Sequence, residues 1–142
     1  MTRKVVLSIR GRQAYREQEP EDIELVTEGT MAFRDGGWDL SYEESELTGL
    51  GGVTTTFRVE PGKVTLKRTG KLHSQIEFSQ GTRHDSLYQM EFGALLISVY
   101  PKQVLFDLTE DGGFIDLVYD IDIEQTTGGT IDYHLDIRAI EE

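Results

Sequence analysis

The chain has 142 residues and a formal net charge of −12, from 26 acidic and 14 basic side chains. This length is typical of one ordinary domain with its own core, so residues 1–142 are predicted to form a single domain. The excess negative charge repels phosphate backbones and anionic lipids, so neither nucleic acid nor a membrane is predicted as a partner.

The cellular compartment is predicted from two features. The chain contains no cysteine, which excludes disulfide bonds and thiolate chemistry and is compatible with a reducing environment. Its N-terminal segment is basic, but the apolar run from Val5 to Ile9 is short and interrupted by Ser8. A secretory signal or a membrane span needs a longer run. A cytoplasmic protein is therefore expected.

Alternating apolar and polar residues predict β-strands along almost the whole chain. In the first half, strands are expected over 5–10, 23–34, 38–45, 53–60 and 63–69, with Gly29 marking a bulge or bend. The polar stretch from Gln13 to Asp22 predicts a loop. Asp35-Gly36-Gly37 predicts a tight hairpin, because glycine accepts the positive φ that such a turn requires.

In the second half, strands are expected over 72–78, 83–90, 94–100, 104–108, 115–123 and 131–137, with a turn from Thr126 to Gly129. No segment has a 3.6-residue apolar repeat long enough for a helix. The prediction is an all-β fold: a single antiparallel up-and-down β-barrel of about ten strands. A sandwich is the alternative, and the barrel is favoured because closure leaves no edge strand.

The predicted inward faces of the middle strands carry polar groups. Glu44 shares a face with Trp38, Leu40 and Tyr42, and Arg68 shares one with Val64 and Leu66; Thr55 and Ser74 add inward hydroxyls. This pattern predicts a pocket at the barrel mouth, where Arg68 binds a carboxylate or phosphate of a ligand. Two alternatives stay open: exposure of both charged residues at strand ends, and an internal ion pair between them.

No catalytic residue, metal site or cofactor is predicted. His73, His84 and His134 lie on separate strands, and His134 is expected to be exposed. His84, Asp85 and Ser86 alternate faces and lack a nucleophile-elbow motif. The acidic residues of the final hairpin are expected on its solvated outer face; they are Asp116, Asp120, Asp122, Glu124, Asp132 and Asp136. Haem bound by a histidine at the mouth is a lesser alternative.

A set of motifs in a fixed order carries a resemblance. This ordered set resembles the YwiB-like family of uncharacterised bacterial proteins. Its members are Tyr42-Glu43-Glu44, Thr54-Thr55-Thr56, Val64 to Arg68 with Gly70, and Tyr88-Gln-Met-Glu-Phe-Gly93. The resemblance implies a calycin-type barrel related in architecture to lipocalins and fatty-acid-binding proteins, and it implies no activity. Residue by residue, it points to Tyr42, Glu44, Arg68, Tyr88 and Gly93.

Together, the pattern and the resemblance predict a non-enzymatic binder of a small amphipathic or anionic ligand. The expected ligand-binding residues are Tyr42, Glu44, Thr55, Arg68, Ser74 and Tyr88. The first alternative is a packed barrel that acts as a protein-interaction module or homodimer, with Trp38, Phe57 and Tyr119 meeting across its axis. The second alternative is an enzyme that uses Glu44 as acid or base beside Tyr42 and Arg68. A monomer or a homodimer is expected.

Overall fold

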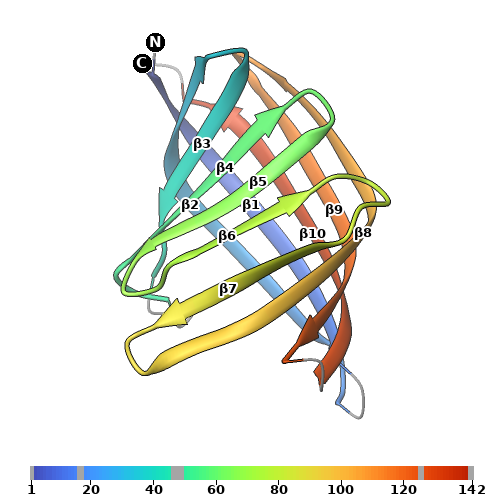
Figure 1. The fold of residues 1–142 in the computed structure, drawn as a ribbon. Helices are drawn as coiled ribbons and strands as arrows, with labels where there is room; N and C mark the ends of the chain where they lie inside the picture. The colour runs from blue at the N-terminus through green and yellow to red at the C-terminus, as the bar shows by residue number, and fades with distance from the viewer. Residues whose placement is uncertain (1, 16–17, 46–49, 125–126, 141–142) are drawn as a thin grey trace.

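The computed structural model describes residues 2–15, 18–45, 50–124 and 127–140. These residues form ten β-strands (Figure 1): β1 (Thr2–Tyr15), β2 (Glu21–Arg34), β3 (Gly37–Glu43), β4 (Val53–Glu60), β5 (Lys63–Gly70), β6 (Ser74–Phe78), β7 (His84–Met90), β8 (Gly93–Thr109), β9 (Gly112–Ile123) and β10 (Thr127–Ala139). Within these ranges, no helix is long and apolar enough to cross a membrane.

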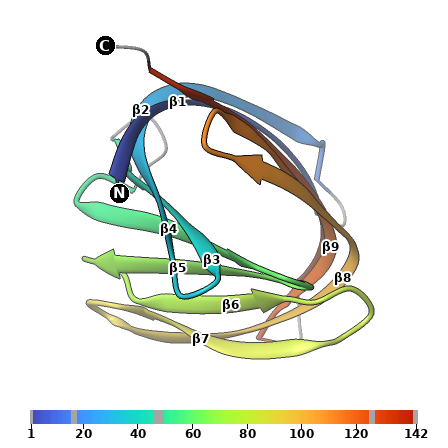
Figure 2. The ribbon, with the colours of Figure 1, turned by 90° about the horizontal axis from the view of Figure 1, so that it is seen from above.

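All ten strands belong to one antiparallel sheet with the order β6-β5-β4-β3-β2-β1-β10-β9-β8-β7. The sheet curves until its two end strands, β6 and β7, lie beside each other (Figure 2). His73 and Gln89 join them by two backbone hydrogen bonds, each 2.8 Å long. The backbone N–H of Glu77 also donates to Nδ1 of His84, 3.3 Å away. The fold is a nearly closed up-and-down barrel, which confirms the predicted ten-stranded architecture over the sandwich.

The alternation along each strand determines which residues face the interior of the barrel, because successive side chains point to opposite faces of a strand. The residues predicted to face inward are buried, among them Val5, Leu7, Ile9, Leu40, Phe57, Val64, Ile76, Phe78, Ile115, Leu117, Leu135 and Ile137. The predicted hairpin at Asp35 and Gly36 is also present, with φ angles of 51° and 77°. Positive φ at both central residues is typical of the turn that matches strand twist.

Several expected strand boundaries were wrong. Strand β1 continues to Tyr15 and β2 begins at Glu21, so the predicted loop is much shorter. Gln13 pairs with Glu21 there, because backbone pairing tolerates polar side chains at a solvated strand end. Strand β10 begins at Thr127, inside the predicted last turn.

The two strands expected over 94–100 and 104–108 are one strand. Strand β8 continues through Pro101, where the pairing with β9 shifts by one residue before Gln103. A bulge tolerates proline because the local ladder needs one backbone N–H fewer.

Gly29 does not mark a bulge, since the pairing of β2 with β1 runs through it without a shift of register. A Cβ at this position would lie 2.4 Å from the carbonyl oxygen of Ser41 and 3.2 Å from Cβ of Tyr42. The absence of a side chain therefore lets β2 and β3 approach each other closely beside Tyr42.

Two aromatic pairs cross the interior of the barrel. The rings of Phe57 on β4 and Tyr133 on β10 stack with centroids 6.0 Å apart. Those of Phe78 on β6 and Tyr119 on β9 lie 4.7 Å apart. Of the three aromatics predicted to meet across the axis, Phe57 and Tyr119 do so through these partners, whereas Trp38 packs against Phe33 at 5.0 Å. Part of the interior is thus filled by side chains.

Candidate functional site

Four of the predicted ligand-binding residues form one row across neighbouring strands. Tyr42 on β3 pairs with Thr55 on β4, Thr55 pairs with Arg68 on β5, and Arg68 pairs with Ser74 on β6. Directly opposite residues of an antiparallel pair point to the same face. Residues far apart in the sequence are therefore neighbours on the inner wall, as alternation predicted.

The row is extended by hydrogen bonds between side chains. Thr55 Oγ1 donates to Oε1 of Glu44 at 2.8 Å, and Glu44 is only 9% exposed. The Tyr42 hydroxyl lies 3.3 Å from that of Tyr133 on β10. Glu44 therefore does not sit in solvent at a strand end, and Thr55 provides a buried partner for its carboxylate. The catalytic role of Glu44 stays a prediction.

A cavity of about 290 Å³ opens beside this row. Its wall is apolar apart from tyrosine hydroxyls, one amide and one guanidinium; the lining residues are Gln13, Tyr15, Leu66, Arg68, Ile76, Tyr88, Leu95, Ile97, Leu117, Tyr119, Ile121, Ile123, Ile131 and Tyr133. Tyr119 and Tyr133 belong to the aromatic pairs that cross the barrel, so these pairs bound the cavity. An apolar cavity with a few convergent polar groups is typical of a small-molecule site.

Three buried polar atoms near the cavity have no hydrogen-bond partner among the described residues. They are Nε of Arg68, Oγ of Ser74 and Oγ of Ser86. All three belong to inward positions on β5, β6 and β7, next to the junction that closes the barrel. Buried donors are normally hydrogen-bonded, so these groups are available to donate hydrogen bonds to acceptor atoms of a bound molecule or of water.

The inner tyrosines are held in their neutral form. Burial is the main cause that raises the pKa of Tyr42 far above its usual value, with further contributions from Tyr133 and Glu44. Burial likewise raises the pKa values of Tyr119 and Tyr133, although the nearby charge of Arg68 opposes the change in both. Protonated hydroxyls can donate hydrogen bonds to a ligand as well as accept them.

Two of the cavity tyrosines pack on glycines of the neighbouring strand. Tyr133 pairs with Gly11 and Tyr15 pairs with Gly129 in the register of β1 and β10. A Cβ on Gly129 would lie 2.7 Å from Cδ1 of Tyr15, and one on Gly11 would lie 3.4 Å from Cδ2 of Tyr133. These glycines leave room for each ring to lie along the adjacent backbone.

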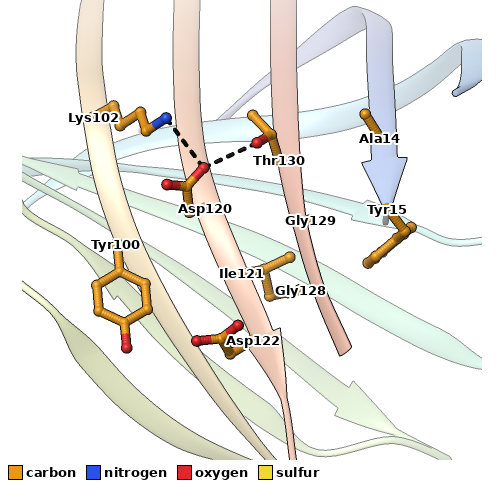
Figure 3. A pocket seen from close by; sticks show the side chains of 10 residues that line it. All are labelled: Ala14, Tyr15, Tyr100, Lys102, Asp120, Ile121, Asp122, Gly128, Gly129 and Thr130. Atoms are coloured by element: carbon orange, nitrogen blue, oxygen red, sulfur yellow. Dashed lines mark hydrogen bonds and ion pairs between the residues drawn. The ribbon is translucent and has the colours of Figure 1, made fainter. Parts of the chain in front are cut away.

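A larger depression, of about 650 Å³, lies over the part of the sheet formed by β8, β9, β10 and β1 (Figure 3). Asp120 is already engaged there by Nζ of Lys102 at 3.2 Å and by Oγ1 of Thr130 at 3.0 Å. None of the predicted ligand-binding residues lines this depression. Asp120, Lys102 and Thr130 satisfy one another there, so the interior cavity is the better candidate site.

The acidic outer face of the last hairpin contains one histidine cluster. His134 contacts Asp116 through Nδ1 and Asp136 through Nε2, the latter at 3.1 Å. Its side chain is 24% exposed, so it is less exposed than expected. In the part of the chain that the structure describes, no group of three or more His, Asp or Glu side chains has an arrangement that could hold a metal ion.

Comparison with known proteins identifies the family. The model of the family described as "Domain of unknown function (DUF1934)" matches residues 7–137. The chain belongs to this family. It is 32% identical over 103 residues to a protein of Bacillus subtilis (strain 168) named "Uncharacterized beta-barrel protein YwiB", over 72% of this chain and 71% of that protein. The predicted YwiB-like resemblance is therefore confirmed.

The fold of this family is known from a solved structure, "Crystal structure of ywiB protein from Bacillus subtilis". The two structures superpose with a TM-score of 0.88 at 24% identity, over 99% of this chain and 94% of that one. The match establishes the barrel architecture. The finer relation to calycins stays a prediction.

Two of the six predicted ligand-binding residues line the cavity, Arg68 and Tyr88. The other four lie on the same inner wall but do not line the cavity; they are Tyr42, Glu44, Thr55 and Ser74. Gln13, Tyr15 and Tyr133 line the cavity but were not predicted as site residues. The alternation of β1 could have found the first two, because Gln13 and Tyr15 continue the inward series from Val5. Polar residues on either side of them made this stretch resemble a loop.

Proposed function

We propose that the protein binds a small amphipathic or anionic molecule inside the barrel and that it acts as a binder rather than an enzyme. The supporting observation is Arg68, whose Nε is buried without a hydrogen-bond partner at the wall of an apolar cavity. Leaving a buried charged donor unsatisfied costs about 1–3 kcal/mol or more. A ligand that supplies an acceptor removes this cost and is therefore bound in preference to a purely apolar molecule.

The arrangement around Arg68 favours an anionic group. A guanidinium presents two parallel N–H groups along its Nε edge, which match the two oxygens of a carboxylate. Ser74, directly opposite Arg68, has a hydroxyl that is buried without a partner among the described residues. The apolar wall formed by leucine and isoleucine side chains would receive the rest of the molecule.

Native mass spectrometry of gently purified protein tests this proposal. We expect a retained small mass that disappears in denaturing spectra and is absent from Arg68→Met. Lys67→Met is the matched control, because Lys67 carries the same charge on the same strand but is exposed on the outer face. A ligand-free mass for all three proteins, with no thermal shift from fatty acids, tetrapyrroles or phosphorylated metabolites, would contradict the proposal.

A second candidate function is protein interaction through the β7–β8 hairpin. Leu87 is 51% exposed, Met90 is 42% exposed and Phe92 at the tip is 97% exposed. We propose that the tip of this hairpin, where Phe92 is exposed, forms a homodimer contact if the barrel carries no ligand. Sedimentation of the wild type and of Phe92→Ser tests it: a dimer lost in the variant is expected, and a wild-type monomer at high concentration would exclude it.

A further inference from the structure

We infer that the ligand is a compact monocarboxylic acid whose acid group binds Arg68 and whose apolar body fills the cavity. This inference rests on the proposed function and narrows it to one chemical class. Three features of the cavity carry it: its size, its single charge and the polarity of its wall.

Size limits the ligand. The cavity measures about 290 Å³. Small-molecule sites typically measure about 300–1,000 Å³, so this cavity lies at the small end of that range. A compact molecule therefore fits it better than a tetrapyrrole, a nucleotide or a long-chain fatty acid. The aromatic pairs Phe57–Tyr133 and Phe78–Tyr119 cross the barrel and prevent the cavity from extending along its whole axis.

The single positive charge of the cavity wall restricts the charge of the acid group that it can bind. Arg68 is the one charged side chain among the described residues that line the cavity. The one guanidinium of Arg68 balances one negative charge, whereas a phosphate dianion would carry a second charge into an apolar site at a high desolvation cost. The net charge of the protein is −12, which further disfavours multiply charged anions. A carboxylate is thus matched better than a phosphate.

The apolar wall of the cavity favours a ligand whose body is also apolar. Leu66, Ile76, Leu95, Ile97 and Leu117 are among the side chains that line the cavity. Burial of aliphatic groups against such a wall is favourable by about 25 cal/mol for each Å² removed from water. The polar groups of the ligand should gather at one end, because the unpartnered donors Arg68 Nε and Ser74 Oγ lie opposite each other on neighbouring strands.

A series of unbranched carboxylates, from butanoate to hexadecanoate, tests the class by calorimetry and thermal shift. Affinity should rise to an optimum near octanoate to dodecanoate and fall for hexadecanoate. Decanol and decyl phosphate, matched to decanoate in chain length, should each bind at least about tenfold more weakly. Arg68→Met should lose the preference for decanoate over decanol, and Lys67→Met should keep it.

A second variant tests size independently of charge. Leu95 lines the cavity opposite Tyr88 in the β7–β8 pairing, and Leu95→Phe should move the optimum to shorter acids while Arg68 is intact. Best binding of hexadecanoate or of decyl phosphate, with Arg68 still required, would overturn the inferred class but support the proposed binder. Binding of no member of the series, or binding unaffected by both variants, would overturn the inference and count against the cavity as the functional site.

Discussion

The hydroxyl of Tyr42 on β3 lies 3.3 Å from the hydroxyl of Tyr133 on β10, although two strands separate β3 from β10 in the sheet. This contact connects the row Tyr42, Thr55, Arg68 and Ser74 to the opposite wall of the barrel. Tyr133 also stacks on Phe57 and lines the cavity. It therefore marks the boundary between the packed part of the interior and the hollow part.

The Tyr42–Tyr133 contact should be measurable as a coupling energy. Tyr42→Phe and Tyr133→Phe should each lower the free energy of unfolding by about 1 kcal/mol, because each removes the partly buried hydrogen bond that the two hydroxyls share. The double variant should lose about 0.5–1 kcal/mol less than the sum, since this shared bond is lost only once. Urea denaturation of the four proteins measures this, and additive losses would show that the hydroxyls do not interact.

Alkaline pH should unfold the barrel through its inner tyrosines. The pKa values of Tyr15, Tyr42, Tyr119 and Tyr133 are raised, mainly by burial. A raised pKa in the folded state means that stability is fully present below the unfolded value of about 10 and declines above it. Absorbance at alkaline pH should show these residues ionising together with unfolding. Their ionisation in a still folded barrel would contradict the buried placement.

The sequence predicted the inner wall better than the strand ends. Alternation placed Tyr42, Thr55, Arg68 and Ser74 inward, because one side of each strand must face the core. It could not show that these four residues share a row, since register depends on pairing between strands. It also could not place Tyr15, because polar flanking residues at a solvated strand end resemble a loop.

The hollow part of the interior was not predictable in the same way. Cavity volume depends on strand number, tilt and register together, and on which aromatics cross the axis. Phe57 and Phe78 find their partners Tyr133 and Tyr119 from distant strands. No local pattern in the sequence encodes those contacts.

His134 should make stability depend on pH near neutrality. Partial burial lowers its pKa, but hydrogen bonds and charges from Asp116 and Asp136 outweigh this, so the pKa is raised. The contribution of the charged imidazole is then complete below about pH 6.5 and is lost as pH rises through the folded pKa.

His134→Gln should therefore cost about 0.5–1 kcal/mol at pH 5.5 and clearly less at pH 9. Asp116→Asn should weaken the same pH dependence. Thermal unfolding across this range measures both variants. An equal loss at the two pH values would show that the charge of His134 contributes nothing.

Gly29 and Gly11 should respond differently to a methyl group. Gly29→Ala places Cβ against the backbone oxygen of Ser41, which cannot move alone, so a loss of more than about 2 kcal/mol is expected. In Gly11→Ala the new Cβ meets the ring of Tyr133 and the backbone oxygen of Asp132 at ordinary contact distances, so stability should change by less than about 1 kcal/mol. Similar losses from both substitutions would mean that β2 and β3 are less closely apposed.

Arg68 is expected to lower the free energy of unfolding of the ligand-free protein. Its buried Nε lacks a partner among the described residues, and Met fills a similar volume without a polar group. Arg68→Met should leave the free energy of unfolding unchanged or raise it by about 1 kcal/mol while ligand binding is lost. A fall of more than about 2 kcal/mol would assign Arg68 a structural role instead.

The most direct measurement is an NMR titration of the Arg68 Nε–H resonance with decanoate, with the resonance assigned by its loss in Arg68→Lys. If the cavity holds an acid against Arg68, this resonance shifts downfield in a saturable manner, and the amide signals that move with it belong to cavity residues such as Ile97 and Tyr133. An unmoved Arg68 resonance, with shifts confined to the outer face of the sheet, would contradict a ligand site inside the barrel.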